Sequence, residues 1–217
     1  KGVVLDVRNN PGGVMNASVE MASNFLDGGL VVYTKGRHPD SMSTYNAEPG
    51  DLLPGVPVVV LVNGGSASAS EIIAGALQDR GRAVIMGTQS FGKGSVQTVL
   101  PVSETKALKL TTSLYYTPNG RSIQAEGIVP DVVVERAQLT SLEQGNRLRE
   151  ADLNRSIENA GPNIETETEA IATLREDDNQ VYEAFTLLKG INVYQSLGAT
   201  PPSDVGADAD ESSSDEQ

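Results

Sequence analysis

The fold of this sequence is constrained most by residues 56–62 (VPVVVLV), which are followed by a Gly-Gly turn and by a helix-forming stretch at residues 71–77. A continuous apolar run of this kind, rich in β-branched residues, is typical of a strand buried on both faces, as in the middle of a parallel sheet. Parallel strands need a crossover between them, and the crossover is usually a helix. The sequence therefore predicts an α/β protein in which this strand is central.

The same alternation of strand and helix extends over the front half of the chain. Residues 3–7 have the pattern of a short buried strand that ends in the turn Asn9-Asn-Pro-Gly-Gly13, and residues 15–25 repeat apolar side chains at helical spacing. Residues 36–55 are a polar excursion without a predicted element. Further strands are expected at residues 30–34, 83–87, 95–101 and 107–116.

The charge of the chain is concentrated behind this front half. The 217 residues carry a net charge of −13, but residues 1–140 contribute only −1 of it and residues 141–217 contribute −12. A nearly neutral front half without a basic stripe argues against nucleic acid as a partner. The back half has the composition of charged helix, with candidates at residues 139–153 and 178–188, and the acidic end from residue 200 is expected to be disordered.

Two absences in the composition narrow the class of protein. No apolar run approaches the ~20 residues that a membrane-spanning helix needs, so no membrane span is predicted. The sequence contains no cysteine, which excludes disulfides and thiolate metal sites. The first predicted strand is already under way at residue 3, and no charged leader with a cleavage site precedes it, so we expect this sequence to be a fragment whose upstream part is missing.

The turn after the central strand carries a serine-rich helix start. In Asn63-Gly-Gly-Ser-Ala-Ser-Ala-Ser-Glu-Ile72, Ser68 is expected beside free backbone N–H groups, where a developing oxyanion would be stabilised. Ser68 and Glu71 also fit a capping box, in which they only satisfy backbone donors. Ser66 and Ser70 are rival nucleophiles on the same grounds. This segment alone leaves both interpretations, cap and nucleophile, open.

A lysine follows Ser68 at a distance of 25 residues, in Ser90-Phe-Gly-Lys-Gly-Ser-Val-Gln97. Glycines on both sides of Lys93 suit a place where the backbone passes close to another group, although a lysine between glycines is also a common turn residue. A hydroxyl and a neutral amine can perform acyl transfer without histidine. The ordinary pKa of a lysine side chain is about 10.4, so this role requires a dry pocket or a neighbouring cation. His38 is the competing base, but its polar, proline-flanked loop predicts a surface residue.

Four motifs, taken in order, closely resemble those of the carboxyl-terminal processing peptidases, also called tail-specific proteases. They are Asn9-Asn-Pro-Gly-Gly13, Gly64-Gly-Ser-Ala-Ser-Ala-Ser-Glu-Ile72, Gly92-Lys-Gly-Ser-Val-Gln97 and Gly120-Arg-Ser-Ile-Gln-Ala-Glu-Gly-Ile-Val-Pro-Asp131. The match covers roughly residues 1–136. The resemblance implies a serine endopeptidase that cleaves proteins near their C-termini without a metal or other cofactor. It also implies an α/β core related to the crotonase and Clp protease fold.

The resemblance also implies a Ser/Lys dyad. Ser68 would be the nucleophile, Lys93 the general base and Gln97 the residue that orients the lysine. Lys93 and Gln97 are four positions apart, so they would face the same side on a turn or on one helical turn. The neutral lysine would take the serine proton during attack on the peptide carbonyl, and the resulting ammonium would protonate the leaving amine before water repeats the cycle.

Supporting positions follow from the same resemblance. The oxyanion hole would consist of the backbone N–H of Ala69 and that of a glycine in the first motif, Gly12 or Gly13. Asp79 matches an acidic position that supports the site in some members of the family. The simpler interpretation of Asp79 is a solvent-facing residue at the C-terminal end of a helix.

These expectations divide the chain into an N-terminally truncated catalytic core at residues 1–136, a helical extension at 137–199 and a disordered acidic tail at 200–217. Members of the family usually carry a PDZ domain ahead of the core, and we find none in this sequence, so the fragment alone is expected to lack part of its substrate recognition. The resemblance implies protein or peptide substrates with exposed C-termini. It further implies a homo-oligomer or an adaptor protein as partner, and a periplasmic or envelope location in a Gram-negative-type bacterium.

Two other classes of function remain open. In one, Ser68 is only a cap, and the fold binds peptide tails by adding them to a sheet edge without cutting them. In the other, a crotonase-like enzyme acts on an acyl thioester, because oxyanion stabilisation at a helix start serves both chemistries. The second hypothesis lacks a recognisable carboxylate pair and gives no role to Lys93 and Gln97.

Overall fold

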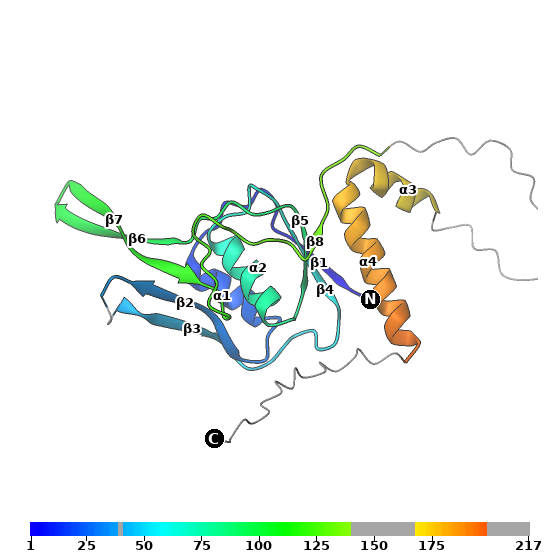
Figure 1. The fold of residues 1–217 in the computed structure, drawn as a ribbon, viewed down its shortest axis with the longest axis horizontal. Helices are drawn as coiled ribbons and strands as arrows, with labels where there is room; N and C mark the ends of the chain where they lie inside the picture. The colour runs from blue at the N-terminus through cyan, green and yellow to red at the C-terminus, as the bar shows by residue number, and fades with distance from the viewer. Residues whose placement is uncertain (39–40, 140–167, 199–217) are drawn as a thin grey trace, which may run out of the picture.

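The centre of the fold is a four-stranded parallel sheet in the order β1-β4-β5-β8 (Figure 1). The computed structural model describes residues 1–38, 41–139 and 168–198 of the chain. The strands of this sheet are β1 (Val3–Asp6), β4 (Val58–Val62), β5 (Val84–Gly87) and β8 (Val132–Val133). Every residue of β4 is buried, and both of its neighbours run parallel to it. The central parallel strand predicted from the sequence is therefore confirmed.

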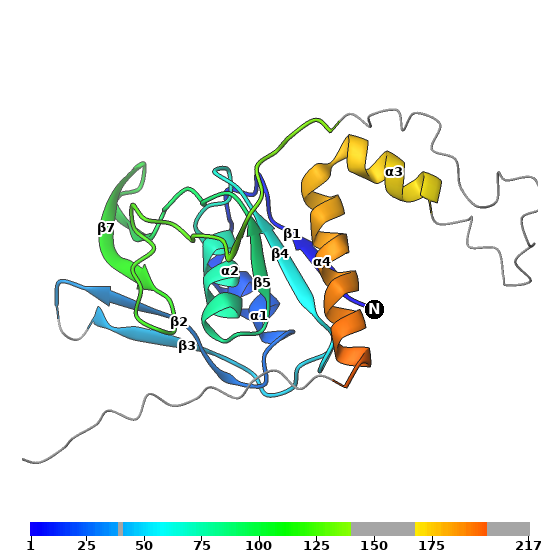
Figure 2. The ribbon, with the colours of Figure 1, turned by 45° about the vertical axis from the view of Figure 1, so that its right-hand side comes forward.

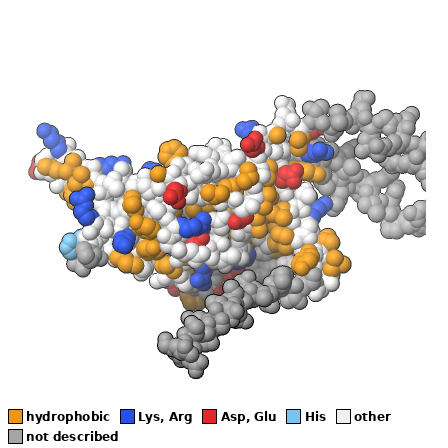
Figure 3. Space-filling model, in the orientation of Figure 1, with side chains coloured by type: hydrophobic (Ala, Val, Ile, Leu, Met, Phe, Trp, Pro, Cys, Tyr) orange, Lys and Arg blue, Asp and Glu red, His pale blue; other side chains and the backbone are white. Residues whose placement is uncertain are grey.

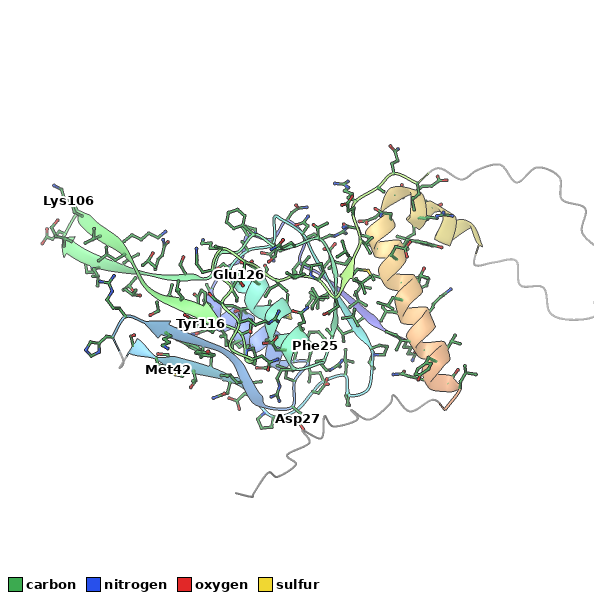
Figure 4. All side chains as sticks on the ribbon, in the orientation of Figure 1. Phe25, Asp27, Met42, Lys106, Tyr116 and Glu126 are labelled. Carbon is green, nitrogen blue, oxygen red and sulfur yellow. The ribbon has the colours of Figure 1, made fainter. Side chains whose placement is uncertain are left out.

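A second, antiparallel sheet has the order β3-β2-β7-β6. Its strands are β2 (Gly29–Gly36), β3 (Ser43–Ala47), β6 (Ser95–Ser103) and β7 (Lys106–Tyr116). β6 and β7 form a long hairpin that projects from the body of the molecule, and Lys106 marks its tip (Figures 1 and 4). β3 lies in the polar excursion where no strand is predicted, and it forms because it pairs with β2.

Two helices, α1 (Met15–Ser23) and α2 (Ala69–Asp79), lie between the sheets (Figures 1 and 2). α2 follows β4 after a short turn, and its residues from Ala69 to Leu77 are all buried. The main core includes buried side chains of α2 and of the facing strands, among them Val58, Val60, Val62, Ile72, Leu77 and Ile85. This burial holds the first turn of α2 in a fixed position at the carboxyl end of β4.

The opposite face of the parallel sheet is covered by α4 (Asn179–Ser196), which α3 (Thr168–Asp177) precedes (Figure 2). A second, smaller core joins them, formed by Val59, Leu61, Met86, Ala184 and Leu188. Alternate residues of β4 thus face α2 and α4, which explains why the strand is an uninterrupted apolar run.

The back half of the chain agrees with the prediction where the structure describes it. The helix expected at residues 178–188 is confirmed as the first part of α4. The helix expected at residues 139–153 lies, apart from its first residue, outside the described residues, and so does the acidic tail from residue 200.

Within the described ranges, the structure contains no helix of the length and apolar character that crossing a membrane requires.

Candidate active site

Ser68 occupies the sharp turn between β4 and α2. Its backbone has φ 57° and ψ −111°, and α2 begins at the next residue, Ala69. A positive φ is unfavourable for a residue with a side chain, so the surrounding structure must hold Ser68 in this conformation. Strain of this kind is concentrated at functional sites, and a strained strand-to-helix turn presents the nucleophile in many hydrolases. The backbone therefore marks Ser68 independently of its sequence motif.

The three serines of this turn differ in what their hydroxyl groups do. Ser66 is fully buried, and its Oγ donates a hydrogen bond to the carbonyl O of Val7 at 2.7 Å. Ser70 is also buried, and its Oγ donates to the carbonyl O of Asn10 at 3.0 Å. Ser68 is half-buried, and its side chain faces the N–H of Glu71 in a capping box instead of bonding to a distant carbonyl group. The hydroxyl groups of Ser66 and Ser70 thus hold the fold together, which leaves Ser68 as the candidate for reaction.

Ser68 and Glu71 stand at the two positions of the predicted capping box. One half of the box is a hydrogen bond of 2.7 Å from the N–H of Ser68 to Oε2 of Glu71. In the other half, the side chain of Ser68 accepts from the N–H of Glu71, which also donates to the carbonyl O of Ser68 at 3.0 Å. The predicted capping box is therefore confirmed. Because the N–H of Glu71 has this second acceptor, the helix start does not depend on the hydroxyl of Ser68 alone. A position at the helix start and a role as nucleophile are compatible.

Glu71 joins the serine turn to the lysine loop. Its side chain is completely buried and accepts hydrogen bonds from four donors. Oε2 accepts from the N–H groups of Ser68 at 2.7 Å and Lys93 at 2.9 Å. Oε1 accepts from Oγ of Ser90 and from the N–H of Gly92, both at 2.6 Å. These bonds compensate the burial of the carboxylate and fix the backbones of both candidate catalytic residues around one carboxyl group.

The glycine turn at residues 9–13 packs against the start of α2. The carbonyl O of Asn10 accepts a hydrogen bond from the N–H of Ala67 at 3.0 Å. Gly12 has φ +95°, and a Cβ there would lie 2.6 Å from the carbonyl O of Ala67 and 2.8 Å from the N of Ala69. Only glycine fits this approach. The structure thus brings the first sequence motif and the serine turn together.

The backbone N–H groups predicted for an oxyanion hole differ in their partners. The N–H of Gly12 donates to Oδ1 of Asn10 at 3.0 Å. In the part of the chain that the structure describes, neither Ala69 nor Gly13 has a hydrogen-bond partner for its N–H. Ala69 and Gly13 therefore present the free donors at the contact between the glycine turn and the helix start.

Lys93 lies on a loop between β5 and β6 that is fixed on two sides. The N–H of Phe91 donates to the carbonyl O of Ser66 at 3.0 Å, which ties the loop to the serine turn. On the other side, the N–H of Gly94 donates to Oε1 of Gln124 at 3.1 Å. A Cβ on Gly94 would collide with the backbone N of Gln124, so this position requires glycine. The fourth sequence motif, which contains Gln124, thus supports the lysine loop.

The side chains of Lys93 and Gln97 are both exposed. The Lys93 ammonium has no hydrogen bond or ion pair to any described residue. Gln97 belongs to strand β6, so the two residues do not share a helical turn. The described residues also do not form the dry pocket that a neutral lysine requires. The structure therefore positions the backbones of the candidate dyad without a side-chain contact between its members.

Asp79 lies at the far end of α2, ~16 Å from Ser68 along the helix axis. Its side chain is 3% exposed and forms an ion pair with Arg121. It also accepts a hydrogen bond from the N–H of Asn119 at 2.8 Å. The interpretation as a solvent-facing residue is wrong, because Arg121 and the turn after β7 cover the carboxylate. Any support that Asp79 gives to Ser68 must act through the length of α2.

His38 is exposed where the chain leaves β2, as predicted for a surface histidine (Figure 3). The described residues contain no cluster of three or more histidine and carboxylate side chains suited to a metal ion.

Arg8, directly before the glycine turn, is the centre of a charge cluster that the sequence did not predict. Its guanidinium donates to Asp6 at 2.7 and 2.9 Å and to Asp178 at 2.7 and 3.0 Å. These hydrogen bonds raise the pKa of Arg8 further above its ordinary value, and those to Asp178 hold the pKa of that carboxyl below its usual range. Asp178 is 170 positions from Arg8, so no local pattern relates them.

Comparison with known proteins shows where the chain resembles them. The family model described as "Peptidase family S41" matches residues 1–134. A carboxy-terminal-processing protease of Bartonella bacilliformis is 48% identical over 194 residues, covering 88% of this chain and 44% of the relative. Carboxyl-terminal-processing peptidase 3, chloroplastic, of Arabidopsis thaliana is 44% identical over 140 residues, covering 64% of this chain and 27% of the relative. The chain thus spans less than half the length of these relatives.

Solved structures resemble the same part of the chain. The photosystem II D1 C-terminal processing protease superposes with a TM-score of 0.58 at 41% identity, covering 62% of this chain and 34% of that one.

Proposed function

Since the chain belongs to peptidase family S41, we propose that it contains the catalytic core of a serine endopeptidase that cleaves proteins near their C-termini. One observation carries this proposal. Ser68 sits in a strained turn, its hydroxyl is not bonded to a distant segment as those of Ser66 and Ser70 are, and Glu71 ties that turn to the loop of Lys93. The carboxyl-terminal processing relatives in bacteria and chloroplasts support the substrate class.

In the proposed reaction, Oγ of Ser68 attacks the peptide carbonyl while neutral Lys93 takes its proton. The developing oxyanion accepts hydrogen bonds from the N–H of Ala69 and from that of a glycine in the first motif. Of the two glycines, Gly13 has the free N–H, whereas that of Gly12 is taken by Asn10. The Lys93 ammonium then protonates the leaving amine. In the second half of the reaction, the neutral lysine takes a proton from water as the water attacks the acyl carbonyl, and the ammonium returns a proton to Oγ of Ser68 as the ester bond breaks.

The exposed side chain of Lys93 must turn toward Ser68 for this reaction. We propose that bound substrate excludes water from the lysine, and that Gln97, whose side chain is also exposed on β6, orients it there. Substrate binding would in this way supply the desolvation that a lysine needs to act as a base.

The wider setting is proposed on the family alone. Residues 1–136 would be the catalytic core, related to the crotonase and Clp protease fold, residues 137–199 a helical extension, and residues 200–217 an acidic tail. Asp79 would support the site from the end of α2. The protein would work in a periplasm or cell envelope, as a homo-oligomer or with an adaptor protein, on substrates with exposed C-termini.

The two other hypotheses find less support. A peptide-binding module without cleavage would give no reason for the positive φ of Ser68, because a serine can cap a helix from an ordinary extended conformation. An acyl-thioester enzyme would give no reason for Glu71 to join the serine turn to the lysine loop, and the matched relatives are proteases.

The test is cleavage of an unfolded reporter with an apolar C-terminal tail by the full-length protein. We expect Ser68→Ala and Lys93→Ala each to abolish cleavage while tail binding is retained. Ser43→Ala and Lys106→Ala, which change an exposed serine and an exposed lysine, serve as matched controls and should leave the rate unchanged. Cleavage that survives Ser68→Ala would refute the nucleophile. A wild type that binds tails but never cuts them would support the binding module.

A further inference from the structure

The N-terminal end of α4 contacts the strand that leads into the glycine turn. Arg8, whose side chain is 12% exposed, lies between β1 and residues 9–13, and it donates to both carboxyl oxygens of Asp178. Its Nη1 also donates to Oε1 of Gln180 at 2.8 Å. Two residues of a helix far along the chain thus converge on one guanidinium next to the candidate site.

We propose that Asp178 and Gln180 are positioning residues that act through Arg8, so that α4 holds the glycine turn in the geometry that the N–H of Gly13 needs for oxyanion binding. This inference rests on the proposed function. It assigns a role to a part of the chain that lies beyond residues 1–134, which the family model matches.

The first turn of α4 is fixed by hydrogen bonds to the segment around β8, so it can hold Arg8 in place. Asn179 and Gln180 are 5% and 3% exposed. Nε2 of Gln180 donates to the carbonyl O of Val134 at 2.6 Å, and Nδ2 of Asn179 donates to the carbonyl O of Glu135 at 2.8 Å. Asp178 caps the helix by accepting from the N–H groups of Gln180 and Val181, both at 3.1 Å. The anchoring fixes the carboxylate of Asp178 relative to the parallel sheet.

The glycine turn needs support at this end because its backbone is strained. Asn9, which directly follows Arg8, has φ 54°, an unfavourable value for a residue with a side chain. The side chain of Asn63 holds Asn9 from the serine turn, accepting from its N–H at 2.9 Å and donating to its Oδ1 at 3.1 Å. The turn is therefore held by the serine turn on one side and by Arg8 on the other. A strained segment persists only where its surroundings determine it in this way.

Asp178→Asn in the full-length protein removes the ion pair with Arg8 but keeps the helix cap, because asparagine is an equally good N-cap. We expect kcat for a tail peptide to fall roughly tenfold with KM little changed, since small displacements of catalytic groups cost rate rather than binding. Amide hydrogen exchange of residues 9–13 should become faster in the same variant. The matched control is Asp51→Asn, which breaks the Asp51–Arg82 ion pair of 2.7 Å and should change neither quantity.

Arg8→Lys provides a second variant, because lysine keeps the charge but cannot bridge Asp6 and Asp178 with a planar fork. It should reproduce both effects in part. A kcat of Asp178→Asn equal to that of Asp51→Asn, or unchanged exchange at residues 9–13, would overturn the inference. A wild type that does not cleave would instead count against the proposed function, and hydrogen exchange would still decide whether α4 holds the turn.

Discussion

Among the described residues, Glu71 is the charged side chain that the core encloses completely. Transfer of a carboxylate out of water is unfavourable unless hydrogen bonds compensate it, and here four donors do so. Three of these donors are backbone N–H groups, at Ser68, Gly92 and Lys93. A single side chain thus sets the relative position of two loops, and its chemistry is predicted to matter for stability and for activity together.

Glu71→Gln should lower the free energy of unfolding by about 2–4 kcal/mol, because the new NH₂ group would face backbone donors and leave some of them unsatisfied. Activity should fall by more than tenfold, because the serine turn and the lysine loop lose their common acceptor. Urea unfolding and tail-peptide cleavage measure the two effects. Glu126→Gln, which changes an exposed carboxylate labelled in Figure 4, is the control. A Glu71→Gln variant as stable and as active as this control would contradict the role assigned to the carboxylate.

At the scale of elements, α4 is attached to the sheet in two chemically different ways. Its apolar side chains Ala184 and Leu188 pack on the parallel strands, while Asp178 at its N-terminus pairs with Arg8. The apolar contacts are independent of pH. The ion pair depends on pH, because it requires the carboxyl of Asp178 to be charged.

Hydrogen bonds from Arg8 hold the pKa of Asp178 below its usual range in the folded protein. A depressed folded pKa adds stability that is complete above the unfolded pKa of about 3.9 and is lost as the pH falls through the folded value. The difference in unfolding free energy between wild type and Asp178→Asn should therefore be constant near neutral pH and shrink below about pH 4. Urea titrations from pH 7 to pH 3 measure it. A difference that stays the same at pH 3 would show that Asp178 acts without its charge.

At the scale of the whole molecule, the β6–β7 hairpin departs from the usual burial of apolar side chains. Leu100, Leu108 and Leu110 are 45%, 48% and 43% exposed, and Val102 is 69% exposed. Apolar side chains colour this projection in the space-filling view (Figure 3). An apolar projection of this kind favours association with other apolar surfaces.

Leu108→Ser combined with Leu110→Ser should reduce the binding of an apolar dye and the self-association of the protein. The unfolding free energy should change by less than about 1 kcal/mol, because exposed positions contribute little to the core. Dye fluorescence, light scattering and urea unfolding measure the three quantities. Ala74→Ser, at a fully buried position of α2, is the contrasting variant and should lose stability. A large loss of stability in the leucine variant would show that Leu108 and Leu110 are buried against another surface and are not exposed to solvent.

Much of the fold follows from local sequence pattern. The apolar run of β4, the helical spacing of α1 and the first part of α4 appear at the predicted places, since periodicity records which side of an element is buried. β3 does not follow from pattern, because its mostly polar residues show no apolar alternation and the strand forms through its pairing with β2 and the contact of Tyr45 and Ala47 with the core. The burial of Asp79 was also missed, since its partner Arg121 lies 42 positions away.

The sequence by itself determined the α/β class, the motifs and the short set of residues from which a site had to be built. Only the tertiary structure distinguished the rival serines from one another, because the hydroxyls of Ser66 and Ser70 find carbonyl partners about 60 positions away. It alone also showed that Glu71 joins two loops and that Asp178 reaches Arg8. The physical reason is the same in each case. Local patterns encode which face of an element is apolar, whereas hydrogen bonds and ion pairs depend on where distant segments meet.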